Sequence, residues 1–233
     1  MVFYTMDSII LASESPRRQD FFRLMGLPFT CMPASIDETP KQGLSPSQIA
    51  EDLALRKTMA VAEKLKSLSL NKTTELHGGR RGICKLSPEL RVPPWLINKR
   101  DSRSEISWIF GADTIVVIGE NILGKPADRD AAGKMLRQLA GRRHEVITAM
   151  ALHNRQTVKT DRRSVSCDVD FAPLTEAEIE WYLDTGEWQG AAGAYRLQEL
   201  GGCLIKSING SPSAVAGLPL HEFYVMLRDN GYR

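Results

Sequence analysis

Ile9-Ile-Leu-Ala-Ser-Glu-Ser-Pro-Arg-Arg18 joins an apolar run directly to a helix start, and this order decides the fold class. The run from Phe3 to Leu11 is typical of a buried strand. Ser15 followed by Pro16 is typical of a helix N-terminus, since serine caps the first turn and proline suits its first position. The sequence therefore predicts a strand followed at once by a helix.

The same alternation continues along the chain. A second helix is predicted from Ser45 to about Leu65, and a strand from Ile109 to Ile118 leads into a hairpin near Glu120. Further expected elements are a helix capped by Asp128, strands over 144–152 and 164–171, a helix opened by a capping box at 175–178, a strand near 203–208 and a last helix over about 219–228. We therefore expect an α/β protein without internal repeats.

The composition limits the class of protein further. The chain has 233 residues, of which 42% are hydrophobic, so it can bury a core as one domain over 1–233. No run approaches the roughly 18 apolar residues of a membrane span, and the first residues lack an export signal. The four cysteines form no CxxC pair. We therefore expect a cytoplasmic protein with neither a disulfide framework nor structural zinc.

Residues 66–108 interrupt the pattern. They carry nine Lys/Arg and four Asp/Glu, together with glycines and prolines that predict no regular element. We interpret them as a basic insertion or mobile loop within the domain. Basic segments can bind nucleic acid, but this one has few aromatic residues and no nucleic-acid-binding motif, so we expect no such partner. Its function is open.

Arg17 and Arg18 lie in the first turn of the predicted first helix, where the helix dipole disfavours cations. An anion at this place would compensate. The hydroxyls of Ser13 and Ser15, free backbone N–H groups and two guanidiniums together make a suitable phosphate site. The residues alone support equally well that both arginines simply point into water.

Asp113 is a single carboxylate in an apolar run, where burial raises its pKa unless a cation or metal is near. If the hairpin turns about Glu120, Ile115 lies opposite Lys125, and Asp113 and Lys125 then share one face of the sheet. The alternative is a structural aspartate at a strand edge. Lys57 lies on the inward stripe of the second helix, where snorkelling to solvent is favoured unless a phosphate is near.

Several separated blocks of sequence occur in an order that resembles the Maf-like nucleotide pyrophosphatase family. They are LASESPRR at 11–18, IDE at 36–38, LALRK at 53–57, GADTIV at 111–116, LGKP at 123–126, LAGRRH at 139–144, GAYRLQ at 193–198, INGS at 208–211 and GLP at 217–219. The resemblance covers about 8–65 and 109–228. It leaves the basic insertion outside.

The resemblance implies an elongated α/β fold with two lobes about a central cleft, similar to inosine triphosphate pyrophosphatases, in a chain that is commonly a homodimer. It also implies Mg²⁺- or Mn²⁺-dependent cleavage of a nucleoside triphosphate between its α- and β-phosphates. Asp113 would be the proton acceptor and, with Glu38, a metal ligand. The phosphate-binding residues would be Ser13, Arg18, Lys57 and Lys125.

Arg17, Thr114 and Gln198 resemble the branch of the family that acts on dTTP and UTP. One amide, that of Gln198, can donate to a carbonyl and accept from N3–H, an edge that thymine and uracil share. Arg196 and Glu199 depart from this branch, which usually has small residues there.

The expected biological role is to limit incorporation of modified nucleotides, with a link to cell division arrest. Two alternatives are a pyrophosphatase for other or modified nucleotides and a nucleotide-binding regulator of septum formation.

Overall fold

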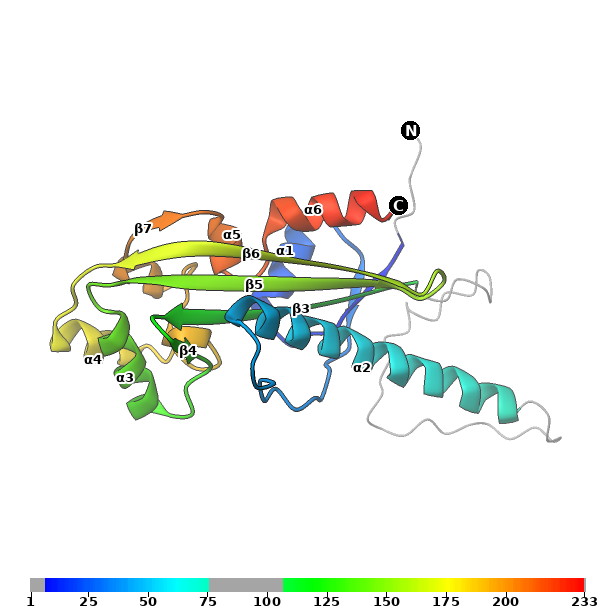
Figure 1. Ribbon diagram of the computed structural model, residues 1–233, viewed down its shortest axis with the longest axis horizontal. Helices are drawn as coiled ribbons and strands as arrows, with labels where there is room; N and C mark the ends of the chain where they lie inside the picture. Colours follow the sequence, from blue (N-terminus) through cyan, green and yellow to red (C-terminus); the bar gives the residue numbers. More distant parts are fainter. Residues whose placement is uncertain (1–6, 76–106, 233) are drawn as a thin grey trace.

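The computed structural model describes residues 7–75 and 107–232, and a mixed sheet of seven strands forms the centre of this part (Figure 1). The strand order is β2-β1-β3-β5-β6-β7, and β4 pairs with β3 outside this path. The strands are β1 (Ile9–Leu11), β2 (Phe29–Cys31), β3 (Trp108–Ile118), β4 (Asn121–Leu123), β5 (Arg143–Asn154), β6 (Lys159–Phe171) and β7 (Ile205–Asn209). Strand β1 runs parallel to β2 and β3, whereas the other pairs are antiparallel.

Helices cover both faces of this sheet, so the predicted α/β class is confirmed (Figure 1). They are α1 (Pro16–Leu24), α2 (Pro46–Glu75), α3 (Arg129–Leu139), α4 (Glu176–Asp184), α5 (Pro212–Val215) and α6 (Leu220–Asp229), with the 3-10 helices η2 (Ala192–Ala194) and η3 (Leu200–Leu204). Among the described helices, none combines the length and the apolar character that crossing a bilayer requires.

Strand β3 has an interrupted edge. On one side, β5 pairs with β3 from Trp108 to Val117. On the other side, β1 pairs only with 108–110 and β4 only with 116–118. Within the described chain, residues 111–115 therefore have no strand partner on that side, and the sheet opens there.

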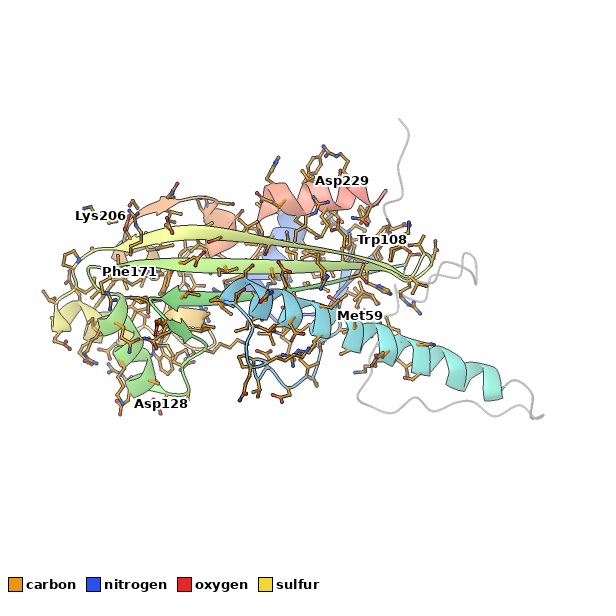
Figure 2. The ribbon with its side chains drawn as sticks, in the orientation of Figure 1. Met59, Trp108, Asp128, Phe171, Lys206 and Asp229 are labelled. Atoms are coloured by element: carbon orange, nitrogen blue, oxygen red, sulfur yellow. The ribbon has the colours of Figure 1, made fainter. Side chains whose placement is uncertain are left out.

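Two apolar cores flank this gap. One joins α1 and α6 to the start of β3, with the Phe110 and Phe223 rings 4.4 Å apart. The other joins α3 and α4 to the end of β3 around the buried Leu136 and Tyr182. Figure 2 shows Phe171 toward one end of the molecule and Trp108 toward the other, and these residues belong to different cores. The expected two lobes about a cleft are thus present.

Helix α2 lies across the opposite sheet face from α6 (Figure 1). Its Ala50 and Ala54 pack with apolar side chains of β3 and β5. Gly111 permits a close approach here, because an added Cβ would lie 2.9 Å from the Ala54 carbonyl oxygen and would overlap the Thr58 side chain. The glycine therefore fixes how near α2 lies to the centre of β3.

The predicted end of this second helix, near Leu65, was wrong. Helix α2 continues to Glu75, so the first ten residues of the predicted insertion are helical. Residues 66–75 contain no glycine or proline, and nothing in them terminates a helix. Residues 76–106 of the predicted insertion lie outside the described residues, as does the beginning of the predicted first strand, and Trp108, the last residue of the insertion, already belongs to β3.

The hairpin register was also wrong by one residue. Val116 pairs with Leu123 and Ile118 with Asn121, so the turn consists of Gly119 and Glu120. Gly119 has φ +58°, which suits a two-residue hairpin turn. Ile115 therefore does not lie opposite Lys125.

The predicted caps are confirmed where side chains supply them. Asp128 accepts a hydrogen bond from the Ala131 N–H at 2.8 Å, and Thr175 and Glu178 form the predicted capping box. The strand predicted near 203–208 begins only at Ile205, because η3 precedes it.

Replacing Gly111 with alanine should lower the free energy of unfolding by about 1–3 kcal/mol, because the methyl group overpacks the contact between α2 and β3. Chemical denaturation of Gly111→Ala and of Gly124→Ala measures this. Gly124 is the matched control, since its added Cβ would meet no atom within 4 Å. Equal stability of both variants would contradict the proposed close approach.

His144 should make the protein sensitive to acid. Burial lowers the pKa of His144 from 6.5 to about 4, while its Nε2 lies 2.9 Å from the Tyr195 hydroxyl. In the unfolded chain, His144 therefore binds a proton at pH values below about 6.5, whereas in the folded chain it stays neutral down to about pH 4. The free energy of unfolding consequently falls as the pH drops from 6.5 toward 4. The free energy of unfolding of His144→Gln should therefore fall by about 2 kcal/mol less between pH 7.5 and pH 5 than that of the unaltered protein. Denaturation curves at both pH values test this, and an unchanged loss would contradict it.

Candidate active site

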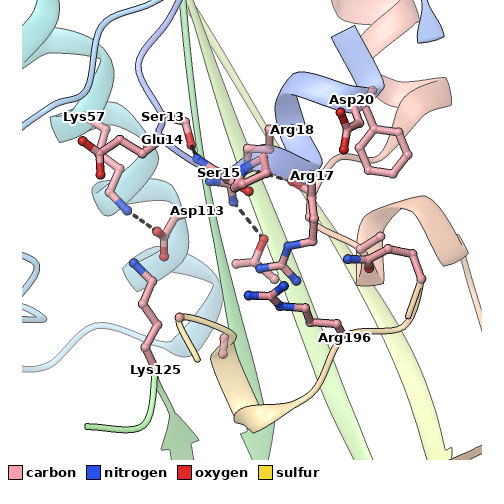
Figure 3. Close-up of a pocket in the computed structure, with 18 of the residues that line it drawn as sticks. Ser13, Glu14, Ser15, Arg17, Arg18, Asp20, Lys57, Asp113, Lys125 and Arg196 are labelled. Carbon is pink, nitrogen blue, oxygen red and sulfur yellow. Dashed lines mark hydrogen bonds and ion pairs between the residues drawn. The ribbon is translucent and has the colours of Figure 1, made fainter. Parts of the chain in front are cut away.

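The gap in β3 opens onto a cleft of about 980 Å³, a volume that accommodates a nucleotide. All nine residues that the sequence predicted for the site line this cleft. They come from both lobes and from α2: Ser13, Arg17, Arg18, Glu38, Lys57, Asp113, Thr114, Lys125 and Gln198. Figure 3 shows Lys57, Asp113 and Lys125 on one side of the cleft and Arg17 and Arg196 on the other.

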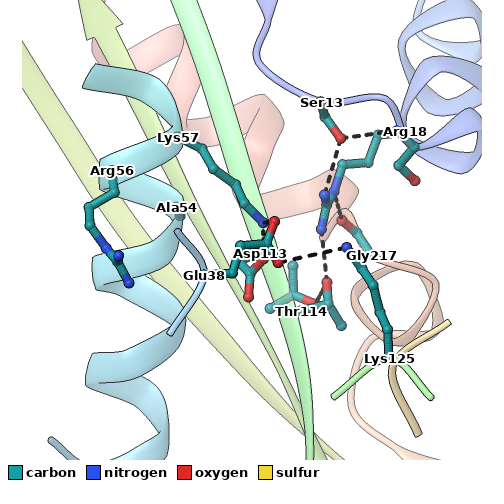
Figure 4. Close-up of polar contacts among 12 residues, drawn as sticks. Ser13, Arg18, Glu38, Ala54, Arg56, Lys57, Asp113, Thr114, Lys125 and Gly217 are labelled. Carbon is teal, nitrogen blue, oxygen red and sulfur yellow. Dashed lines mark hydrogen bonds and ion pairs between the residues drawn. The ribbon is translucent and has the colours of Figure 1, made fainter. Parts of the chain in front are cut away.

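Lys57 and Asp113 form a buried ion pair at the gap. The Lys57 Nζ lies 2.5 Å from Asp113 Oδ1 and 2.9 Å from Glu38 Oε1 (Figure 4). The side chain of Lys57 is only 9% exposed, so this lysine does not snorkel to solvent. Asp113 likewise has a cationic partner, as a carboxylate in an apolar strand requires.

Glu38 is the most exposed member of this group. Burial pushes the pKa of Glu38 upward, but the hydrogen bond and charge of Lys57, together with Lys125, outweigh it and hold the pKa below its usual value. The carboxylates of Glu38 and Asp113 thus converge on one cation. Among the described residues, no group of three or more His, Cys, Asp or Glu side chains is placed to hold a metal ion.

Lys125 reaches the cleft by a route different from the predicted one. Lys125 lies two residues after the end of β4 at Leu123, so it is not part of the hairpin ladder. The exposed Nζ of Lys125 lies 3.7 Å from Glu38 Oε2. Lys125 therefore lies on the same side of the cleft as Asp113, as predicted, although Ile115 and Lys125 are not paired across the hairpin.

Arg18 is directed into the protein. Its Nη1, Nη2 and Nε donate to Ser13 Oγ at 3.3 Å, Thr114 Oγ1 at 3.1 Å and the Gly217 carbonyl at 3.0 Å (Figure 4). The alternative in which this arginine points into water is wrong. Burial lowers the pKa of Arg18, while Asp113 and Glu38 raise it. Arg18 thus holds three segments of the cleft together and adds positive charge beneath it.

Hydrogen-bond directions at Thr114 follow from its partners. Thr148 donates to the Ala214 carbonyl at 2.8 Å, so Thr114 donates to Thr148 at 2.9 Å and accepts from Arg18. Thr148, which holds Thr114 from the neighbouring strand, was not predicted from the sequence. Only the strand register, which pairs it with Thr114, could have identified it.

Ser13 keeps one donor for a ligand. Its Oγ accepts from Arg18 and from the Ser15 N–H at 3.2 Å, and its own hydroxyl hydrogen has no acceptor among the described residues. Ser15 precedes α1 as predicted, but its side chain makes no capping hydrogen bond. The first turn of α1 therefore offers N–H groups to an anion beside the Ser13 hydroxyl.

Arg17 and Gln198 lie toward another part of the cleft. No described residue forms a hydrogen bond or ion pair with the guanidinium of Arg17, which is half-buried. Burial, followed by the charges of Arg18 and Arg196, lowers the pKa of Arg17 to about 10. Gln198 is exposed between η2 and η3, where its amide can contact a ligand.

Comparison with known proteins shows the family of the chain. The family model described as Maf-like protein matches residues 8–230. The dTTP/UTP pyrophosphatase of Symbiobacterium thermophilum is 38% identical over 230 residues, which cover 97% of this chain and 96% of that protein. The dTTP/UTP pyrophosphatase of Pelotomaculum thermopropionicum is 37% identical over 227 residues, which cover 97% and 98%.

Among solved structures, the Staphylococcus aureus Ham1 protein aligns with a TM-score of 0.39 and 14% identity over 71% of this chain and 72% of that chain. This likeness is too slight to add to the assignment. The family match extends over nearly the whole chain, and relatives more than a third identical align over almost their full length. The chain therefore belongs to the Maf-like protein family.

Proposed function

We propose that the protein hydrolyses dTTP and UTP to the nucleoside monophosphate and pyrophosphate. The observation that carries this proposal is the Asp113–Lys57 pair at the open edge of β3, in a cleft lined by further cationic side chains. The names of the relatives, which are dTTP/UTP pyrophosphatases, supply the substrate class. A protein that only binds nucleotides would not need the Asp113 carboxylate, fixed by Lys57, next to the phosphates.

Asp113 is the proposed proton acceptor. Lys57 contacts its Oδ1, and no other described residue bonds to Oδ2, which can therefore accept the proton of a water molecule. The resulting hydroxide attacks the α-phosphorus, the bond from this phosphorus to the bridging oxygen breaks, and pyrophosphate leaves with the bonding electrons. General bases of this kind contribute roughly 10²–10⁴-fold to the rate.

The cationic and N–H groups have the complementary task of stabilising charge. Lys57 and Lys125 are placed to neutralise negative charge as it moves onto the leaving pyrophosphate. The Ser13 hydroxyl and the first turn of α1 can donate to phosphate oxygens. Arg18 gives one N–H each from Nε, Nη1 and Nη2 to protein acceptors and keeps a second N–H on Nη1 and on Nη2, so it remains a proposed phosphate-binding residue that also supports this surface.

Glu38 and Asp113 are the proposed ligands of a divalent cation, Mg²⁺ or Mn²⁺. The structure fits such an ion, because both carboxylates already approach one ammonium group within 2.9 Å. Such ions bind through one or two carboxylates together with substrate phosphates. When bound, the ion neutralises phosphate charge and polarises the phosphoryl group.

The other expectations from the sequence stay predictions. They are the homodimer, the cytoplasmic location, the link to cell division arrest and the limiting of modified nucleotides. Activity on other or modified nucleotides is the alternative within the same chemistry, and a panel of triphosphates separates it from the proposed substrates.

Replacing Asp113 with asparagine should lower kcat for UTP by roughly 10²–10⁴-fold, because the amide cannot accept the proton. Pyrophosphate release measures this, and circular dichroism checks the fold. Asp130→Asn is the control, since Asp130 is exposed on α3 and does not line the cleft. Release of orthophosphate in place of pyrophosphate by the unaltered protein would contradict the proposed cut.

Replacing Gln198 with alanine should reduce the preference for UTP over purine triphosphates by about 10-fold or more, because the variant loses the paired donor and acceptor. The ratio of kcat/KM for UTP and GTP measures this preference. Gln138→Ala on α3, outside the cleft, is the matched control. An unchanged ratio would show that other residues read the base.

A further inference from the structure

Arg196 lies in the cleft opposite the Asp113–Lys57 pair. Figure 3 shows its guanidinium beside that of Arg17, with Lys125 and Asp113 on the other side. Both arginines line the same cavity, and each carries a charge that repels the other. Such a pair of cations is most favourable when a ligand supplies acceptors between them.

Protein contacts hold Arg196 in this position. Its Nη1 donates to both carboxylate oxygens of Glu199 at 3.3 Å, and its Nη2 donates to the Gln189 carbonyl at 2.7 Å. Its backbone N–H donates to the Tyr182 hydroxyl at 3.2 Å. The side chain is 29% exposed, so most of it is already removed from water before any ligand binds. Arg196 is therefore preorganised rather than mobile.

The segment that follows Arg196 is held as well. The carboxylate of Glu187 accepts hydrogen bonds from the Leu200 and Gly201 N–H groups, each at 3.2 Å. Gly201 has no room for a side chain, because an added Cβ would lie 2.6 Å from the Arg196 carbonyl oxygen. These contacts fix the loop that presents both Arg196 and Gln198.

Donors remain unused on both arginines. A guanidinium has five N–H donors and no acceptor. The Arg196 Nη2 has two N–H groups and gives one to the Gln189 carbonyl, and no described residue accepts a hydrogen bond from the Arg17 guanidinium. This part of the cleft is therefore rich in donors and suits a ligand edge that consists of acceptors.

The charge of Glu199 decides what kind of acceptor fits. Its carboxylate contacts Arg196 and offsets the positive charge there. A triphosphate whose α-phosphorus lies at Asp113 has its phosphates near Lys57 and Lys125, and Figure 3 shows Arg196 across the cleft from these residues. Arg196, whose charge Glu199 already offsets, is therefore left for a neutral acceptor such as a carbonyl oxygen.

We propose that Arg196 is a specificity-determining residue that, with Arg17, selects a nucleobase presenting carbonyl oxygens over one presenting an exocyclic amine. The proposal rests on the proposed function and assigns Glu199 as the positioning residue. Uracil and thymine present a carbonyl where cytosine has an amine. An amine would place donor against donor, and a buried donor left unpaired is costly.

Kinetics of Arg196→Ala and Arg196→Lys with UTP, dTTP, CTP and dCTP test the proposal by pyrophosphate release. For Arg196→Ala, we expect KM for UTP and dTTP to rise about 10–100-fold, as the loss of a hydrogen bond from a charged donor implies, with kcat nearly unchanged. KM for CTP and dCTP should change little, so that discrimination falls. Arg162→Ala is the control, since Arg162 is exposed on β6 and away from the cleft.

Glu199→Gln tests the positioning role. It keeps the side-chain shape but weakens the hold on Arg196, so we expect a smaller rise in KM for UTP and dTTP and a correspondingly smaller loss of discrimination. Thermal unfolding of each variant checks the fold, and Arg196→Lys serves if the alanine variant is unstable. An equal rise in KM for all four nucleotides would show that Arg196 contacts the phosphates. No rise in KM would show that Arg196 does not contact the nucleotide. Either result overturns the proposal.

Failure of the proposed function can be told apart from failure of this inference. If the unaltered protein released no pyrophosphate from any of the four nucleotides, the proposed function would fail. Calorimetry with UMP and CMP would then still decide the role of Arg196. Tighter binding of UMP that Arg196→Ala abolishes supports the role, and equal binding of UMP and CMP overturns it.

Discussion

The buried ion pair between Lys57 and Asp113 is the constraint on which the site depends. Taking each charge out of water costs several kcal/mol, and only close, well-directed contact offsets this. The 2.5 Å separation requires α2 to lie against the middle of β3, and Gly111 leaves the space for that approach. The packing of helix α2 on the sheet and the placement of the Asp113 carboxylate, the proposed proton acceptor, are thus one structural requirement.

The division of the protein into two lobes follows from the lengths of the strands around β3. Strand β5 accompanies nearly all of β3, while β1 and β4 each cover one end of its other edge. Asp113 and Thr114 lie between them. Each lobe has its own apolar core and contributes different groups to the cleft, so a substrate must contact both lobes to engage the full set of donors.

Local sequence signals predicted much of this arrangement. Asp113 is a single carboxylate in an apolar run, and the caps at Asp128 and Thr175 depend on neighbouring residues, so both were accessible from the sequence. The hairpin register was not accessible from the sequence. The predicted turn centred on Glu120 and the observed two-residue turn of Gly119 and Glu120 differ by one residue in register, and both suit the local sequence. The orientation of Arg18 depends on a carbonyl 199 residues away, and no local pattern reports such a contact.

The open stretch of β3 also bears on how the protein avoids self-association. An unpaired strand edge invites pairing with another chain, which leads to aggregation. Here the unpaired residues 111–115 lie between two strands of the same sheet, at the bottom of a cleft. A foreign strand of ordinary length, about 5–6 residues, would collide with β1 or β4 before it could form a ladder. The cleft thus admits a small ligand to Asp113 and Thr114, while the flanking strands keep another polypeptide from pairing with this edge.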